Sequence, residues 1–429
     1  MWRFGVMVLP LIFLAGCGEN GSNGDSGNGV AAGAAETEGL QAFVGARIFD
    51  GTGAPWIEDG VLVVSDGIVQ EVGAASQVDV PAGAQVVDLE GRWIVPGFIN
   101  SHGHAGGDRN EVLRQLDVYA HYGVTTVVSL GGDTEAGVQL RNEQWTPTLD
   151  RSRIFVAGPV LNPSTPDEAR ADATRLREMD VDWLKIRVDD NLGQGQKMPR
   201  EVYEALIAAG LELGLPLAAH IYQLEDAKGV VEAGARLVAH SVRDAPVDAE
   251  LAALMRERDV CLVPTLTREY STFVYAERPS WFYDTFLLER ANPNEIAALE
   301  DPEYQAQIQQ SAAARYWREA FPVAQENMRQ LHSEGVGVAM GTDTGPFGRF
   351  QGYFEHLEME MMVDSGMSPV DVLTSATGTA ARCMGLEGVV GTLEPGAWAD
   401  FVALAADPTA DIRNTRQIRG VWIAGNQYR

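Results

Sequence analysis

Short apolar runs alternate with longer amphipathic stretches through the middle of the chain. Eight runs have the length and apolar content of buried strands, at residues 94–100, 124–130, 154–160, 183–188, 216–221, 236–241, 260–266 and 336–341. The stretches between them predict helices, for example at residues 167–180, 199–214, 224–234 and 247–258, since acidic residues lie near their starts and glycine near several ends. Eight strand–helix repeats predict an α/β protein with a TIM-like (β/α)8 barrel, whose active site lies at the carboxyl ends of the strands.

Both ends of the chain have a different pattern, in which short segments of alternating apolar and polar residues are separated by glycine and aspartate. Segments of this kind lie at residues 43–49, 61–64, 68–72 and 85–89, and again at 389–393, 399–404 and 420–424. The pairs Asp50-Gly51, Asp59-Gly60 and Asp66-Gly67 are typical of turns that close hairpins. We therefore expect residues 39–93 and 386–429 to form one small β-sandwich that flanks a barrel of residues 94–385.

The link between the seventh and eighth predicted strands, residues 267–334, is much longer than a usual barrel loop. Its first part, 267–290, is rich in aromatic residues, namely Tyr270, Phe273, Tyr275, Trp281, Phe282, Tyr283 and Phe286. A loop after a barrel strand lies over the active site, so this part could be a wall or lid of the substrate pocket. The alternative is that the aromatic residues form a small core of the insertion itself.

The first 38 residues predict export and attachment to a membrane. A basic start and an apolar run up to Ala15 are typical of a signal peptide, and the run is too short to span a bilayer. Its end, Leu14-Ala-Gly-Cys17, resembles the lipobox of bacterial lipoproteins, in which the cysteine is acylated; the alternative is an ordinary signal peptide with a chance cysteine. The lipoprotein signal peptide is then residues 1–17 and ends at Cys17, which becomes the acylated first residue once the preceding segment is removed. Residues 18–38 form a flexible tether. We expect a lipoprotein of the bacterial cell envelope that faces the periplasm and contacts the membrane only through its lipid.

Composition narrows the range of partners. The net charge is −28, with 60 acidic against 32 basic side chains, so the surface repels phosphates and nucleic acid is excluded as a partner. We attribute the acidity to solubility. The sequence does not decide between a monomer and a homo-oligomer. Beyond Cys17, Cys261 and Cys383 are expected to be small buried residues, because nothing in the sequence requires them to form the disulfide that a periplasmic location would permit.

Six polar residues fall at the carboxyl ends of the predicted strands. His102 and His104 end the first strand, Lys185 lies in the fourth, His220 and His240 end the fifth and sixth, and Asp343 follows the eighth. Barrel topology brings these side chains to one opening, and imidazoles two apart on a strand share a face. By itself His-x-His is as readily a glycine-rich turn, and Lys185, between Leu184 and Ile186, could extend its amine to solvent at a strand edge. Burial of a lysine is costly unless it is paired or modified.

Taken in order, the motifs of the chain resemble the amidohydrolase superfamily of metal-dependent hydrolases, in its imidazolonepropionase-like and zinc-dependent prolidase-like branch. The resemblance covers essentially everything after the tether. It rests on Ile48-Phe-Asp-Gly-Thr-Gly53, Asp88-Leu-Glu-Gly-Arg-Trp-Ile-Val-Pro-Gly-Phe-Ile-Asn-Ser-His-Gly-His104, Gly123-Val-Thr-Thr126, Gly341-Thr-Asp-Thr344 and Gly391-Thr-Leu-Glu-Pro-Gly-Ala-Trp-Ala-Asp400.

The resemblance implies a site for two divalent metal ions. His102 and His104 would hold one ion, His220 and His240 the other, and a carboxylated Lys185 would bridge them. Asp343 would ligate the first ion and accept a proton from a water that bridges the metals. Zinc is the expected metal, with manganese and cobalt as alternatives, because these ligands suit several divalent ions.

The expected activity is hydrolysis of a C–N bond in a small molecule, a dipeptide-like or cyclic amide, by a metal-bridging hydroxide. One alternative is a lactonase or phosphotriesterase on the same site, and another is a lipid-anchored binding protein without catalysis. Tyr222 and Arg187 lie two residues beyond His220 and Lys185, so each is a candidate substrate contact; the alternatives are barrel filler and a rim salt bridge. The link 158–167 is shorter than in many relatives, so contacts that those make there cannot be carried over.

Overall fold

Seven parallel strands form the barrel wall in the computed structural model, which describes residues 39–429. They are β6 (Phe98–Gly103), β7 (Val124–Ser129), β8 (Arg153–Val156), β9 (Leu184–Arg187), β10 (Leu217–His220), β11 (Leu237–Ala239) and β12 (Cys261–Val263). Strands β6 to β8 form one sheet and β9 to β12 another, each in chain order, and a bridge from Leu161 to Ile186 joins the two. The predicted barrel class is confirmed. Residue Cys17 and the predicted tether lie outside the described residues.

The segment predicted as an eighth strand, residues 336–341, is extended but does not form a regular strand. It closes the barrel through two isolated parallel bridges, Leu262 to Val338 and Gly103 to Thr344. Close backbone approach explains the glycine in this segment, since a Cβ at Gly341 would lie 2.8 Å from the backbone nitrogen of His102. The prediction of a regular strand was wrong, because the segment pairs with its neighbours only through isolated bridges and not through a continuous ladder. The chain turns just beyond it, at Asp343, whose φ is 59°.

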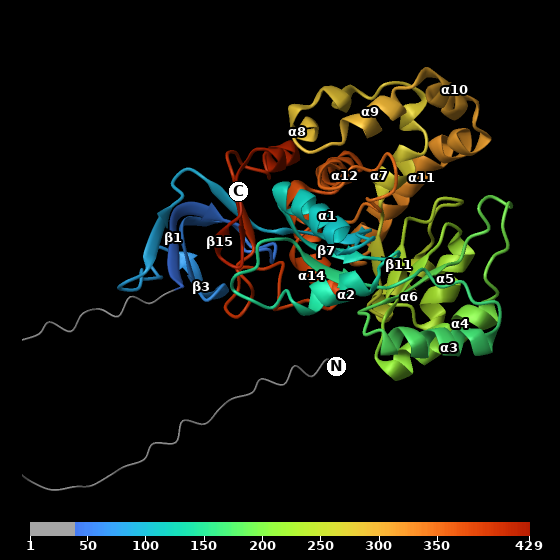
Figure 1. The fold of residues 1–429 in the computed structure, drawn as a ribbon, viewed down its shortest axis with the longest axis horizontal. Helices are drawn as coiled ribbons and strands as arrows, with labels where there is room; N and C mark the ends of the chain where they lie inside the picture. The colour runs from blue at the N-terminus through green and yellow to red at the C-terminus, as the bar shows by residue number, and fades with distance from the viewer. Residues whose placement is uncertain (1–38) are drawn as a thin grey trace, which may run out of the picture. The chain divides into compact units, whose positions relative to one another are not determined.

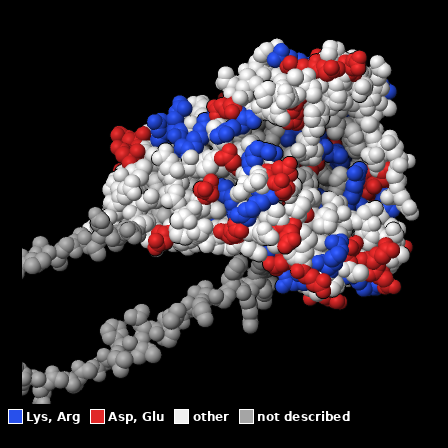
Figure 2. All heavy atoms as spheres, in the orientation of Figure 1, with Lys and Arg blue, Asp and Glu red and all other residues white. Residues whose placement is uncertain are grey.

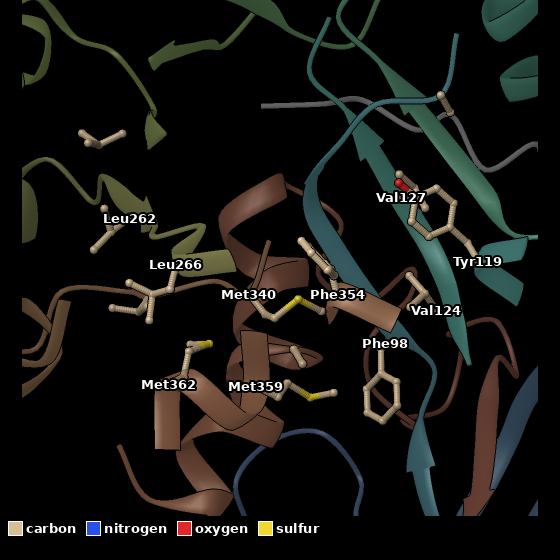
Figure 3. Packing of buried hydrophobic residues seen from close by; sticks show 14 of the residues in the cluster. Phe98, Tyr119, Val124, Val127, Leu262, Leu266, Met340, Phe354, Met359 and Met362 are labelled. Carbon is tan, nitrogen blue, oxygen red and sulfur yellow. The ribbon is translucent and has the colours of Figure 1, made fainter. Parts of the chain in front are cut away.

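The helices outside the barrel cover its apolar strands. They are α1 (Arg109–His121), α2 (Glu135–Asn142), α3 (Pro166–Glu178), α4 (Arg200–Leu213), α5 (Leu224–Ala233), α6 (Ala249–Glu257), α12 (Tyr353–Asp364), α13 (Pro369–Ser375) and α14 (Gly378–Met384). Figure 3 shows part of the core, where Phe98 and Val124 from the strands lie near Met340 and near Met359 of α12. Within residues 39–429 no helix is both long and apolar enough to cross a membrane.

Charged side chains of both signs are mixed over the face in Figure 2, with acidic groups gathered over α3 and α4 and along the top of the insertion. The two signs of charge are therefore interspersed over this face.

The long link after β12 folds mainly into helices. It comprises α7 (Leu266–Ser271), η1 (Val274–Ala276), η2 (Ser280–Tyr283), α8 (Thr285–Leu288), α9 (Pro293–Leu299), α10 (Pro302–Gln310) and α11 (Ala312–Ser333). Helices α8 to α10 form the upper part of the view in Figure 1, above α12. The aromatic residues of this link fall into two groups. Trp281 packs against Phe354 of α12, whereas Phe273 joins Tyr222 and Trp317 in a separate cluster. One group is therefore core and the other lies beside the barrel opening.

Both chain ends contribute strands to one flanking sheet. Its strands are β1 (Leu40–Ile48), β2 (Ile57–Ser65), β3 (Ile68–Ala74), β4 (Gln85–Asp88), β5 (Trp93–Pro96), β13 (Phe401–Leu404), β14 (Ile418–Ile423) and β15 (Asn426–Gln427), with the helical turn η3 (Ile412–Arg416) before β14. Phe43 of β1 lies 4.9 Å from Phe401 of β13, whose ring stacks on Trp422 at 4.8 Å. The strands from the two ends thus share one apolar core, which gives the flanking domain its sandwich character.

Three local predictions need correction. The run 94–100 is two strands, because β5 pairs with β1 and β13 of the flanking sheet whereas β6 begins the barrel. The break is at Gly97, whose missing side chain leaves room for Thr125. Asp66-Gly67 closes the β2–β3 hairpin with φ angles of 50° and 78°, but Asp59-Gly60 lies inside β2. Residues 389–393 form turns rather than a strand.

A disulfide bond joins Cys261 of β12 to Cys383 of α14, with Cα atoms 5.8 Å apart. We expected two separate buried residues. The pairing was hidden from the sequence because 122 residues separate the cysteines, and only barrel closure brings α14 against the start of β12.

Replacement of both cysteines by alanine should lower the free energy of unfolding by at most about 5 kcal/mol, because the crosslink restricts a loop of more than a hundred residues in the unfolded chain. Chemical unfolding with and without a reductant measures this. The double variant serves as the control, since a reductant should not change its midpoint. Equal midpoints for the oxidised and reduced wild type would contradict the prediction.

Candidate active site

The six residues predicted from the sequence converge at the carboxyl end of the barrel. His104 Nε2 lies 2.6 Å and His102 Nε2 3.5 Å from the same oxygen, Oδ1 of Asp343. Lys185 Nζ is 3.3 Å from His102 Nε2. The ring of His240 is centred 4.9 Å from that of His102 and 4.3 Å from that of His220. Strands that are far apart in the sequence thus supply one continuous group of side chains.

Outer hydrogen bonds orient three of the imidazoles. His104 Nδ1 donates to the carbonyl of Gly131 (2.8 Å), His220 Nε2 donates to Asp189 Oδ2 (2.8 Å), and His240 Nδ1 lies 2.6 Å from the hydroxyl of Thr265. The carbonyl and the carboxylate can only accept, so they fix the tautomers of His104 and His220, and each of the three bonds turns the other ring nitrogen inward. In the described part of the chain, Nδ1 of His220 and Nε2 of His240 have no hydrogen-bond partner. These nitrogens are free to bind a metal ion.

Burial sets the charge of the basic groups. It lowers the pKa of His220 to about 3 and holds the pKa of His102 and of His240 well below 6.5, so these rings are neutral. Burial also lowers the pKa of Lys185 to about 7, which populates its neutral amine near neutral pH. For His104, burial alone would lower the pKa, but its hydrogen bond to Asp343 raises it.

Asp343 is ionised, and nearby basic side chains stabilise its charge. Burial alone would raise the pKa of its carboxyl group, but Arg349, followed by His102 and His104, keeps it well below its usual value. Nη1 of Arg349 donates to Asp343 Oδ2 at 2.6 Å. The two carboxylate oxygens therefore face different partners, one the imidazoles and the other the guanidinium group.

The donor set fits a divalent metal ion. Ligand atoms of His102, His104 and Asp343 lie within 4.8 Å of one another, and neutral imidazole and carboxylate are ligands that zinc and related ions bind. Three left-handed residues, His240, Thr265 and Asp343, have φ angles of 72°, 50° and 59°. Strained backbone of this kind clusters at functional sites, where the surrounding structure holds it in place.

The two predicted substrate contacts have different settings. Arg187 is partly exposed, and its Nη2 lies 3.3 Å from Asp189, which corresponds to the rim salt bridge that we considered as an alternative. Tyr222 is buried in the aromatic cluster with Phe273 and Trp317, beside the opening.

Sequence reasoning missed Asp189 and three arginines, which all follow the carboxyl ends of the strands: Arg243 and Arg349 in loops and Arg268 in α7. Asp189 could have been found, because it continues the alternation of Lys185 and Arg187.

Residues 93–428 match the amidohydrolase family. The chain belongs to the amidohydrolase family. The family predicted from the motifs is confirmed, and so is the class of enzyme, a hydrolase that acts on carbon–nitrogen bonds. The imidazolonepropionase of Rhodococcus jostii is 26% identical over 373 residues, which cover 82% of this chain and 83% of that protein. The imidazolonepropionase of Pseudomonas putida is 26% identical over 402 residues, which cover 86% and 92%.

Solved structures share the fold. A putative prolidase from Bifidobacterium longum superimposes with a TM-score of 0.75 at 24% identity, over 91% of this chain and 94% of that one. A Xaa-Pro dipeptidase with methionine bound in its active site gives a TM-score of 0.72 at 20% identity, over 91% and 99%. At these identities the similarity establishes the fold alone.

Substitution of Asp189 by alanine should weaken metal binding or turnover by about 10- to 100-fold, because His220 loses the partner that fixes its ring. Asparagine at the same position retains an acceptor oxygen and should preserve most of the affinity. Metal content after dialysis and titration with zinc measure the effect. Equal affinities for the alanine variant and the wild type would show that His220 needs no such support.

Proposed function

We propose that this protein is a binuclear metal-dependent amidohydrolase that cleaves a C–N bond in a small dipeptide-like or cyclic amide. The convergence of four histidines, Lys185 and Asp343 at one barrel opening carries the proposal. Imidazolonepropionases among the relatives and a Xaa-Pro dipeptidase among the solved structures support an amide as the substrate class.

His102, His104 and Asp343 would hold one ion, and His220 and His240 the other. Divalent ions bound there supply a water of lowered pKa, hence a hydroxide near neutral pH, and they polarise the scissile carbonyl group. We expect zinc. The inward nitrogens of His220 and His240, and the neutral charge state of these rings and of His102, support this assignment.

Lys185 would bridge the two ions as a carbamate. Its pKa of about 7, lowered by burial, leaves a neutral amine that can react with carbon dioxide. The product carries a negative charge and two oxygens, so carboxylation also removes the cost of a buried ammonium group.

Asp343 moves the proton. It is ionised before the reaction, so it can accept the proton of the attacking water and then donate it to the leaving nitrogen. Arg349 holds one oxygen of Asp343, which leaves the other, beside His102 and His104, to take the proton. The leaving group is a basic amine, which departs only when it is protonated, so the reaction requires this proton transfer.

Zinc-loaded protein should hydrolyse members of a panel of dipeptides and cyclic imides. Chelation should remove the activity and a divalent metal should restore it. The variant Lys185→Ala should bind less metal and lose turnover to background, as measured by product analysis together with metal analysis. Turnover of lactones without amides would contradict the proposal, and well under one metal ion per chain after growth with zinc would favour a binding protein.

We also propose that the protein is a periplasm-facing lipoprotein anchored through Cys17. The disulfide between Cys261 and Cys383 supports an oxidising compartment.

The variant Cys17→Ser should lose the lipid and leave the membrane fraction, because one acylated cysteine is the whole predicted anchor. Fractionation of cells with immunodetection measures this, with Cys383→Ser as a control that retains the lipobox. Wild-type protein found in the soluble fraction would refute the anchor.

A further inference from the structure

Helix α12 carries two fully buried glutamates that the mechanism does not use. Glu355 and Glu358 are three positions apart, so their side chains lie on the same side of the helix. A carboxyl group in the core is costly unless hydrogen bonds satisfy it. The partners of these two groups therefore indicate what the groups are for.

Glu358 holds the start of α7. Its Oε1 accepts a hydrogen bond from the backbone nitrogen of Leu266 at 2.7 Å. Its Oε2 accepts from both the backbone nitrogen and the hydroxyl group of Thr267, each at 2.7 Å. Both oxygens of Glu358 thus act as acceptors. Leu266 and Thr267 directly follow Thr265, so these bonds fix the direction in which the chain leaves that residue.

Thr265 connects Glu358 to a predicted metal ligand. Its φ of 50° is left-handed, which is unfavourable for a β-branched residue and persists only where the surrounding structure holds it. The hydroxyl group of Thr265 lies 2.6 Å from Nδ1 of His240, and this contact turns Nε2 of His240 inward. Glu358 therefore stabilises the strained turn that orients His240.

Glu355 holds a second strained turn in a similar way. Its Oε1 accepts hydrogen bonds from the hydroxyl groups of Thr342 and Thr344, both at 2.9 Å. These two threonines flank Asp343, whose φ of 59° is also left-handed. Oε2 of Glu355 is buried and has no hydrogen-bond partner within residues 39–429. In contrast to Glu358, Glu355 acts through one oxygen only.

We propose that Glu355 and Glu358 are positioning residues, and that each orients a ligand of a different metal ion. Glu355 orients Asp343, and Glu358 orients His240, in both cases through threonines. This inference rests on the proposed function, because it concerns the two ions proposed there. Helix α12 packs against α7, so a single rigid element sets the spacing of the two halves of the site.

Glutamine at position 358 should impair one ion selectively. Both oxygens of Glu358 accept hydrogen bonds, so the side-chain amide of Glu358→Gln must turn its NH2 group toward a backbone nitrogen. We expect the ion held by His220 and His240 to bind about 10- to 100-fold more weakly, while the affinity for the other ion stays unchanged. Stepwise calorimetric titration of the chelator-treated protein with zinc measures both affinities.

Glutamine at position 355 should be tolerated. The side chain of Glu355→Gln can keep its carbonyl oxygen on the threonines and place its NH2 group where Oε2 has no partner, so both zinc affinities should be retained. Glu355→Leu removes the acceptor, and it should weaken the ion held by His102, His104 and Asp343 by a similar factor. A role in folding alone would not separate the two ions.

The matched control is Glu360→Gln. Glu360 lies on the same helix but pairs with Arg416 of η3, so this variant should keep both zinc affinities. The background His240→Ala identifies the affected ion. In that background Glu358→Gln should cause no further loss of zinc, whereas Glu355→Leu should still weaken the remaining ion.

Thermal unfolding establishes that each variant is folded. If Glu358→Gln does not fold, Thr267→Val decides the question. It loses only the hydroxyl bond to Oε2 of Glu358, and it should weaken the same ion as Glu358→Gln.

Equal losses of both ions in Glu358→Gln, or unchanged zinc binding in both Glu358→Gln and Glu355→Leu, would overturn the inference. A wild type that binds a single zinc ion would overturn it as well. These titrations need no substrate. If the wild type binds two ions but turns over no amide, the proposed reaction fails, and the zinc affinities of the variants still decide whether the glutamates position the ligands.

Discussion

The site depends on how the barrel closes between its first strand and the segment 336–344. The carbonyl of His102 accepts hydrogen bonds from the backbone nitrogens of Thr342 and Asp343, at 3.2 and 2.6 Å, and His104 N donates to the carbonyl of Thr344 at 2.9 Å. These backbone bonds place Asp343 beside both histidines. Buried side chains reinforce them, because Asn100 Nδ2 on β6 donates to Thr342 and to Glu355 of α12, at 2.9 and 2.6 Å. A polar network buried this deeply specifies one arrangement, since any other would leave its groups unpaired.

The same first strand links the barrel to the flanking domain. Gly97 separates β5 from β6, and its nitrogen donates to the carbonyl of Asp400 next to β13. The carboxylate of Asp400 pairs with Arg153 of β8 at 2.7 Å, both side chains buried, and Trp398 covers the guanidinium group at 4.3 Å. Removal of one partner would leave an unpaired buried charge, so this ion pair fixes how the two chain ends dock on the barrel. The disulfide from β12 to α14 adds a covalent link within the barrel.

Charged side chains surround the opening of the barrel. Arg187, Arg243, Arg268 and Arg349 surround it, with Asp189, Glu269 and Asp343 as their carboxylate partners. The arginines outnumber these carboxylates, although the chain as a whole carries −28. The surface charge of a protein and the charge of its pocket are separate properties, because the pocket is shielded from solvent and determined by a few side chains.

The sequence by itself determined the barrel class and the family, and it predicted that six side chains converge at one opening: His102, His104, Lys185, His220, His240 and Asp343. Strand periodicity is local, and parallel strands in a barrel bring their carboxyl ends together, so position along the chain was enough. Only the tertiary structure decided the break at Gly97, the irregular closing segment and the disulfide. It also decided the contacts of Arg243, which follows β11, since this side chain meets Glu269 of α7 and Trp317 of α11. Both partners are distant from Arg243 in the sequence, and no local pattern records their approach.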